Sequence, residues 1–188
     1  MIKQALLSSL LIVACFSFAG VAQTAQSTRR FPDKQTLLTK AQEGDVSAQF
    51  WLGTGYEQGW FGNADYQQAL MWLRKAAKRG NPDAQVCLGQ MYESGEGVRQ
   101  NYVQAAKWYR KAAEHVPDFG GAGQGRNNLG LLYLNGQGVP KDLVRAYMWF
   151  SLAGTEASLS EANAHLTAAQ VRKAERMATE WKNSHPER

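Results

Sequence analysis

The sequence predicts an all-α fold, a right-handed α-solenoid of helix-turn-helix repeats with capping helices at the N- and C-terminal ends. The first observation is a short pattern of Leu-Gly, Tyr and Gly that recurs at the same offsets from Leu52, Leu88 and Leu129. The second is that each copy holds two stretches in which apolar residues return every three or four positions, the spacing of one helix face. Since one helical hairpin cannot bury its own apolar face, successive copies are expected to stack.

The central repeat shows how each element is predicted. Ala84, Leu88 and Tyr92 return every four residues and therefore share one face of a first helix. Asn81, followed by a proline, is a typical helix start. Asn101, with a glutamine three residues later, has the spacing of a capping box that opens a second helix. Equivalent residues stand 36 positions earlier and 41 positions later, so five extra residues fall in the glycine-rich stretch EHVPDFGGAGQG.

The flanks of the repeats are predicted from similar signals. The stretch TLLTKAQEGD looks like the second helix of a degenerate leading repeat that ends at Gly44, and Thr167 with Gln170 has the capping-box spacing of a last helix. The expected segments are a signal peptide (1–22), a flexible mature N-terminus (23–34), a leading half-repeat (35–44), three repeats (45–80, 81–116 and 124–156), C-terminal capping helices (157–183) and a tail (184–188).

The first 22 residues have the layout of a secretory signal peptide. Lys3 precedes an apolar run from Ala5 to Ala19, and a cut after Ala22 would follow the small residues that a signal peptidase reads. The run is shorter than the ~20 residues needed to span a bilayer, so a retained anchor is disfavoured. A lipoprotein in which Cys15 becomes the lipidated first residue is the alternative. We expect an exported protein, periplasmic or secreted, without a transmembrane segment in the mature chain.

Composition and charge argue against a nucleic-acid-binding function. The chain has 188 residues, of which 44% are hydrophobic and 11% aromatic, enough for one domain with a buried core. Its formal net charge is +5, and the basic residues are spread over polar helix faces without a nucleic-acid-binding module. We therefore expect no nucleic-acid partner, and we expect a monomer.

Glycine stands inside the first helix of each repeat, at Gly53, Gly89 and Gly130. Because glycine in a helix interior costs about 1 kcal/mol relative to alanine, its recurrence predicts that another helix approaches closely there. The bulky residues at repeated positions are predicted to be core and not ligand-stacking groups. The predicted repeat core consists of Leu52, Gly53, Tyr56, Trp72, Leu88, Gly89, Tyr92, Trp108, Leu129, Gly130, Tyr133 and Trp149.

The complete pattern A-x-x-x-L-G-x-x-Y-x-x-G-x-G-V-x-x-(D/N)-x-x-x-A-x-x-W-x-x-x-A-A resembles the Sel1-like repeat, a relative of the tetratricopeptide repeat. The central copy, Ala84 to Ala113, matches throughout, whereas the first copy has Phe61 and Gly62 where the pattern has Gly-Val. The resemblance implies a non-catalytic module that binds a partner protein or peptide in the cell envelope. Some exported Sel1-like proteins are linked to β-lactam binding or hydrolysis, which keeps open an envelope factor that binds or processes peptidoglycan or β-lactam-like ligands.

Residues with catalytic chemistry are sparse. His115, His165 and His185 lie far apart without metal-ligand spacing, no serine is followed at the third position by lysine, and no K-T-G is present. Cys87 is the only cysteine after a cut at Ala22, so no intramolecular disulfide can form. A small buried hydrophobe is favoured over a reactive thiol. We expect no enzyme activity, no metal and no cofactor.

Candidate contact residues come from comparing the copies, since side chains that the repeat does not dictate are able to specify a partner. The positions that differ include the polar residues Gln49, Gln85, Gln90, Arg126 and Asn127. We expect these side chains to contact an extended peptide or protein segment; the alternative is that they face solvent. Trp60 and Phe61, which stand where the other copies have turn residues, are expected either to form an exposed anchor or to pack under the loop.

Overall fold

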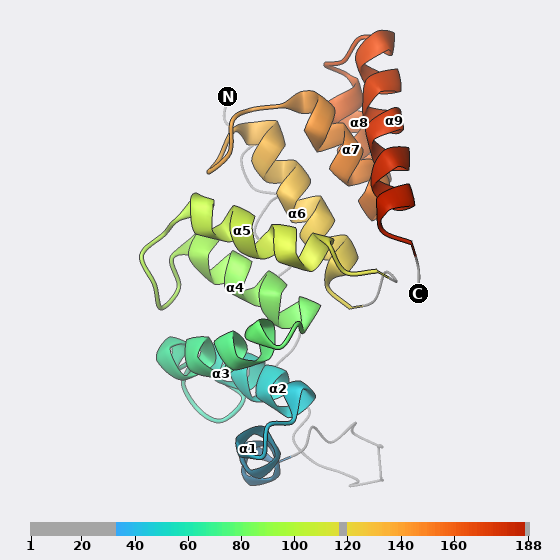
Figure 1. Ribbon diagram of the computed structural model, residues 1–188. Helices are drawn as coiled ribbons and strands as arrows, with labels where there is room; N and C mark the ends of the chain where they lie inside the picture. Colours follow the sequence, from blue (N-terminus) through green and yellow to red (C-terminus); the bar gives the residue numbers. More distant parts are fainter. Residues whose placement is uncertain (1–32, 117–119, 187–188) are drawn as a thin grey trace, which may run out of the picture. The chain divides into compact units, whose positions relative to one another are not determined.

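The computed structural model describes residues 33–116 and 120–186. The chain divides between Phe31 and Pro32 into two units, and every described residue belongs to the second. The predicted signal peptide and the lipidation alternative at Cys15 lie outside the described residues. Over the described ranges the structure contains nine helices and no strand (Figure 1). They are α1 (Lys34–Gln42), α2 (Val46–Glu57), α3 (Tyr66–Lys78), α4 (Pro82–Ser94), α5 (Tyr102–Ala113), α6 (Ala122–Asn135), α7 (Leu143–Ala153), α8 (Glu156–Asn163) and α9 (Ala168–Ser184).

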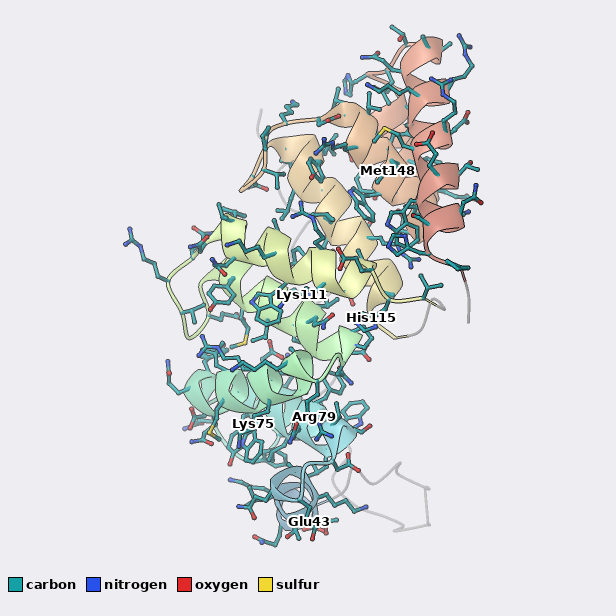
Figure 2. All side chains as sticks on the ribbon, viewed as in Figure 1. Glu43, Lys75, Arg79, Lys111, His115 and Met148 are labelled. Atoms are coloured by element: carbon teal, nitrogen blue, oxygen red, sulfur yellow. The ribbon has the colours of Figure 1, made fainter. Side chains whose placement is uncertain are left out.

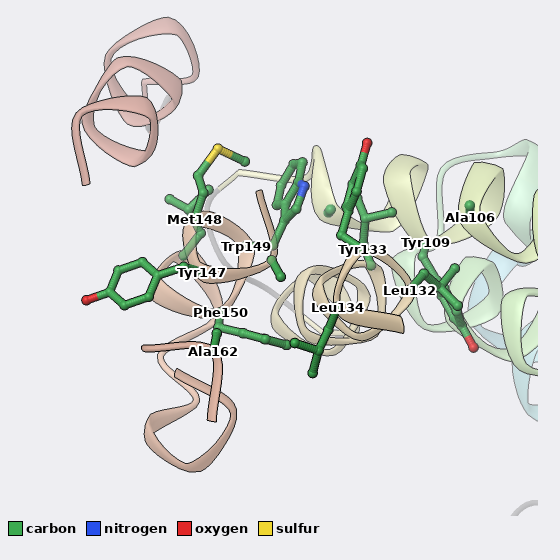
Figure 3. Packing of buried hydrophobic residues seen from close by; sticks show 14 of the residues in the cluster. Ala106, Tyr109, Leu132, Tyr133, Leu134, Tyr147, Met148, Trp149, Phe150 and Ala162 are labelled. Atoms are coloured by element: carbon green, nitrogen blue, oxygen red, sulfur yellow. The ribbon is translucent and has the colours of Figure 1, made fainter. Parts of the chain in front are cut away.

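Each helix packs against the next from α1 to α8, and α9 packs on α7. Figure 1 shows α2 with α3, α4 with α5, and α6 with α7 as successive helical hairpins. Buried apolar side chains form one cluster around α1 and α2, a second in α3 and α4, and a third centred on α5 to α9. In the third cluster Tyr109, Leu132 and Phe150 bring together α5, α6 and α7 (Figure 3). The predicted all-α solenoid is confirmed.

Side-chain caps start the helices at the predicted polar residues. Asn81 Oδ1 accepts the backbone N–H of Ala84 at 2.7 Å, at the start of α4. Thr167 and Gln170 form the two reciprocal bonds of a capping box at the start of α9. Each of these bonds satisfies an N–H that has no partner within its own helix.

The helix-interior glycines lie against the second helix of their own repeat. A Cβ atom on Gly89 would be 2.3 Å from Cε1 of Tyr109, and one on Gly53 would be 2.7 Å from Cγ of Leu73. Gly130 has the same relation to Phe150, at 2.5 Å. The partner residues occupy equivalent positions and are completely buried. The predicted close approach is therefore present in all three repeats, and its cause is a large side chain that crosses the glycine.

The predicted core residues divide into two groups. Leu52, Trp72, Leu88, Leu129, Tyr133 and Trp149 are buried, as are the three helix-interior glycines. Tyr56, Tyr92 and Trp108 are half-buried and pack against the edges of the clusters. The hydroxyl of Tyr92 accepts a bond from Arg74 of the preceding repeat at 3.2 Å. Tyr92 therefore places its polar tip at the surface while its ring contributes to packing.

Candidate partner-binding surface

Gln49, Gln85 and Arg126 occupy equivalent positions in the first helices, and all three are buried, with 5%, 4% and 4% of their surface exposed. Gln49 Nε2 donates to the carbonyl of Ala41 at 3.0 Å, and Gln85 Nε2 donates to the carbonyl of Ala77 at 3.1 Å. In both cases the acceptor lies eight residues upstream, at the end of the preceding helix. These side chains join each repeat to the helix before it, which corrects the expectation that they face a partner or the solvent.

Arg126 has the same role across a longer connection. Its Nε donates to the carbonyl of Ala113 at 3.1 Å, Nη2 to His115 at 2.9 Å and Nη1 to Leu152 at 3.3 Å. The guanidinium also lies over the ring of Trp181 in α9, 4.9 Å from its centroid. The five extra residues before α6 place the acceptor thirteen residues upstream, and the longer arginine side chain spans that gap. Carbonyl groups at the C-terminal ends of α5 and α7 stabilise the buried positive charge.

Gln90, Asn127 and His115 lie in three different environments. Gln90 is exposed on α4, whereas Asn127 is half-buried and its Oδ1 accepts a bond from Ser158 Oγ of α8 at 3.2 Å. His115 Nε2 lies 3.2 Å from Oε1 of Gln85, and burial lowers the pKa of this histidine. His115 is therefore part of the repeat junction and is neutral at neutral pH. Of the five polar candidates, Gln90 is the one exposed to solvent.

Phe61 packs inside the first repeat. A Cβ atom on Gly55 would be 2.3 Å from Cε2 of this ring, so the phenylalanine fills the space that a side chain at Gly55 would use. The positions equivalent to Gly55 are occupied by the buried side chains Met91 and Leu132 in the other repeats. Phe61 also makes an edge contact with Tyr56, at 5.4 Å between ring centroids. Of the two expectations for Phe61, packing under the loop describes the structure.

Trp60, by contrast, is exposed and stacks on Trp51 of α2. The ring centroids are 6.3 Å apart with an interplanar angle of 29°, and the two side chains are 41% and 40% exposed. Phe50 extends the aromatic group, with its ring centroid 5.0 Å from that of Trp51. Trp51 stands at a position that differs between the copies, where the second and third repeats have Cys87 and Asn128. No sequence signal placed it beside Trp60, because the contact depends on how the turn after α2 folds back.

Charge separates the first helices from the second helices of the repeats. The second helices α3, α5 and α7 carry seven basic residues and no acidic one, and all seven side chains are exposed. They are Arg74, Lys75, Lys78, Lys107, Arg110, Lys111 and Arg145. The first helices α2 and α4 carry Glu57, Asp83 and Glu93 and no basic residue. In repeats one and two, the acidic residues of the helices therefore belong to the first helices and the basic residues to the second helices.

Two of the basic residues cover tryptophan rings at equivalent places. Lys75 Nζ lies 4.0 Å from the ring centroid of Trp72, and Lys111 Nζ lies 4.5 Å from that of Trp108. Figure 2 labels both lysines on the second helices. Their stems and charges are thus used partly for packing on the repeat itself.

Acid–base groups in the first helices are shifted toward their neutral forms. Burial, followed by the charge of Glu96, raises the pKa of Glu57, and burial raises the pKa of Asp83. The same burial, with these two acids nearby, raises the pKa of Cys87 to about 12. A thiol with this pKa stays protonated at neutral pH and is a poor nucleophile. The structure thus describes Cys87 as a packing residue.

Two further properties hold over residues 33–116 and 120–186. Within these ranges no group of three or more His, Cys, Asp or Glu side chains is arranged to hold a metal ion. None of the helices there combines the length and apolar character required to cross a bilayer.

Comparison with known families and structures agrees with this architecture. The model of the Sel1 repeat matches residues 46–81, 82–115 and 124–158, more than half of the chain. A protective antigen of uropathogenic Escherichia coli with an SLR fold superposes with a TM-score of 0.72 at 32% identity. The alignment covers 81% of this chain but 33% of the antigen, so the chain spans about a third of that protein.

Two smaller proteins match along nearly their whole length. A Sel1 repeat protein from Oxalobacter formigenes has a TM-score of 0.58 at 37% identity, over 69% of this chain and 96% of that one. Cysteine rich protein B of Helicobacter pylori has a TM-score of 0.50 at 25% identity, over 68% and 95%. A search of curated proteins gives no match. The repeat geometry, the matched family model and these structures together show that the chain belongs to the Sel1 repeat family.

Proposed function

We propose that this protein is an exported adaptor or regulator that binds a partner protein or peptide through its repeat surface and catalyses no reaction. Sel1 repeats are typically protein-interaction modules, and this chain has the three repeats such a module needs. The observation that carries the proposal is the stacked pair Trp51 and Trp60, each about two-fifths exposed. Tryptophan is enriched among residues that dominate binding energy at protein interfaces.

Export is the second part of the proposal and is supported by the layout of residues 1–22. The test is to express the full chain in a bacterium, fractionate the cells and determine the N-terminus and mass of the product. A product that begins at Gln23 in the periplasm or medium supports cleavage by a general signal peptidase. A product that begins at a lipidated Cys15 supports the lipoprotein, and an uncut cytoplasmic chain would overturn export.

Partner binding is tested by capture from an envelope extract with the processed chain. One arm carries the native sequence and the other carries Trp51→Ala with Trp60→Ala. The proposal predicts a defined protein that is captured by the native chain, depends on the two tryptophans and binds again when purified. If purified peptidoglycan fragments or β-lactams bind instead, and no protein does, the adaptor function is wrong.

A further inference from the structure

We propose that Arg110, Tyr133 and Arg145, called here the two-arginine site, bind the side-chain carboxylate of an aspartate or glutamate in an acidic segment of the partner. This inference rests on the proposed binding function and adds a second contact to it. The contact lies at the junction of the second and third repeats, whereas Trp51 and Trp60 belong to the first repeat.

Two arginines from different helices converge on one hydroxyl group in this site. Nη2 of Arg110 in α5 donates to the hydroxyl oxygen of Tyr133 in α6 at 3.2 Å, and Nη1 of Arg145 in α7 donates to the same oxygen at 3.4 Å. The two nitrogens therefore lie no further apart than the sum of these distances. The guanidinium of Arg145 also lies over the Tyr133 ring, 5.6 Å from its centroid.

The site is anchored in the core and open at the surface. Tyr133 is buried, and its carbonyl accepts the backbone N–H of Asp142 at 2.9 Å, at the start of α7. Figure 3 shows its hydroxyl pointing away from Leu132. Both arginine side chains are exposed, that of Arg145 by 54%. A buried residue thus positions two guanidinium groups that a partner is able to reach, which lowers the entropy lost on binding.

The chain's own acids leave donors of the site available. Asp142 Oδ2 lies 3.3 Å from Nε of Arg145, while Oδ1 of the same carboxylate accepts the backbone N–H of Arg145 and caps α7. Glu114, four residues after Arg110, is exposed at the end of α5. A guanidinium group has five N–H donors, more than the tyrosine and Asp142 use on either arginine. A carboxylate of the partner that bonds to both guanidinium groups would also reduce their mutual repulsion.

The charge around the site favours an acidic segment over a single anion. Lys107 stands three residues before Arg110, so the two exposed side chains are neighbours on one face of α5. The helices α5 and α7 themselves carry no acidic residue. A segment with several carboxylates therefore meets positive charge beside the site as well as in it.

The junction of the first and second repeats is an internal comparison. Arg74 of α3 donates to the hydroxyl of Tyr92 at 3.2 Å, as Arg110 does to Tyr133 one repeat later. The residue equivalent to Arg145 is Gln104, which is neutral. The first junction forms without a second arginine, so packing between repeats does not require the charge of Arg145.

The test measures binding of short peptides to the full chain as it is isolated from the expressing bacterium. The probes are hexaglutamate and hexaglutamine with both ends blocked, hexaglutamine with a free C-terminal carboxylate, and inorganic phosphate. Two variants change the site: Arg145→Gln, which copies Gln104, and Tyr133→Phe, which leaves the net charge unchanged. Arg74→Gln at the first junction is the matched control for the lost charge, and thermal denaturation checks that each variant is folded.

We expect blocked hexaglutamate to bind with an affinity that falls as salt is added, and to shift the NMR signals of Arg145 and Tyr133 but not those of Tyr92. Arg145→Gln should weaken binding about tenfold and Tyr133→Phe about threefold. Arg74→Gln should stay within about twofold of the native affinity. A loss in Tyr133→Phe separates positioning of the arginines from a general effect of net charge.

No binding of hexaglutamate, or equal losses in Arg145→Gln and Arg74→Gln, would overturn the inference. Phosphate or a free C-terminal carboxylate that binds as tightly as hexaglutamate would also overturn it, because the site would then take a free anion or a chain end.

The adaptor function has separate outcomes. If the native chain and Arg145→Gln capture the same defined protein equally well from the envelope extract, the function stands and the inference fails. If hexaglutamate binds as expected but no protein is captured, the adaptor function is wrong while the preference of the site for side-chain carboxylates is supported.

Discussion

The first and third repeats solve the same packing problems with different side chains. At the junction with the preceding helix, the first repeat uses Gln49 and one hydrogen bond, whereas the third uses Arg126 and two. A third bond joins Arg126 to Leu152 of α7. Inside the hairpin, the third repeat fills its core with Leu132 from the helix, whereas the first has Gly55 and fills the space with Phe61 from the turn. The repeats share one backbone arrangement, but each fills its core and bonds to its neighbours with different side chains.

This difference explains how the first repeat came to present aromatic residues. A turn that inserts Phe61 into the core also brings its neighbour Trp60 back over α2, where it meets Trp51. In the second repeat the equivalent turn has Gly97, where a Cβ atom would be 2.6 Å from that of Tyr66 in the preceding repeat. A bulky residue is therefore excluded there, and the exposed aromatic pair is a property of the first repeat.

The largest expected effect comes from the junction residue of the third repeat. Replacing Arg126 by alanine removes bonds to Ala113, His115 and Leu152 and the contact with Trp181, leaving buried carbonyls without donors. We expect the free energy of unfolding to fall by about 3 to 5 kcal/mol. Urea denaturation followed by circular dichroism measures this change.

The matched control is Gln49→Ala, which removes one hydrogen bond at the equivalent position of the first repeat. We expect a loss of about 1 kcal/mol. If the two substitutions destabilise the protein equally, then the difference in bonding between the first and third junctions has no energetic meaning.

The next effect tests the feature that the repeats share. Gly89→Leu would introduce a side chain where even a Cβ atom lies 2.3 Å from the buried ring of Tyr109. Overpacking should lower stability by about 3 kcal/mol even though leucine favours helix. An unchanged or raised melting temperature would refute the close-approach explanation.

A double-mutant cycle makes that prediction sharper. Gly89→Ala should cost less stability when Tyr109 is already alanine, because the ring that meets the new methyl group is then absent. If the effects of the two substitutions on stability are strictly additive, then position 89 requires glycine for a reason other than its contact with Tyr109.

A smaller effect is expected from replacing the side chain that fills the core of the first repeat by the one that fills the core of the second. Phe61→Ala alone should cost about 2 kcal/mol by opening space over Gly55, and Gly55→Met alone should also destabilise, because its side chain meets the phenylalanine ring. The double variant places in the first repeat the residue found as Met91 in the second. It should recover most of the loss in thermal denaturation, whereas a double variant worse than either single one would show that Gly55 and Phe61 are not coupled.

These comparisons also show which parts of the structure were predictable. The repeat period, the helix starts and the helix-interior glycines were readable because each depends on local spacing, as the cap at Asn81 shows. The role of Gln49, Gln85 and Arg126 was not predictable, because their acceptors lie at the ends of other helices. The change from glutamine to arginine looked like variation at an unconstrained position. In fact the arginine compensates for five inserted residues.

The stacked tryptophans were missed for a related reason. Trp60 stands where the other repeats have a turn residue, but its contact with Trp51 depends on the path of the turn, in which Gly59 and Gly62 have φ angles of +70° and +130°. Side-chain contacts set by an irregular turn leave no periodic signal in the sequence.

The smallest expected effect comes from Glu57, at the end of α2. Burial and the charge of Glu96 raise the pKa of Glu57, so its ionised form is disfavoured in the folded protein. The native chain therefore loses stability as pH rises from the ordinary glutamate pKa of about 4.3 through the raised value. Glu57→Gln should be as stable as the native chain or more stable by less than about 1 kcal/mol at pH 7. That advantage should disappear below about pH 4, where the native glutamate is protonated in both states.

The exposed Glu175→Gln on α9 is the control, with little change expected at either pH. Melting temperatures at both pH values measure the sign for the two variants. If Glu57→Gln lowers stability at pH 7, then the ionised carboxylate stabilises the folded protein, contrary to the expected direction.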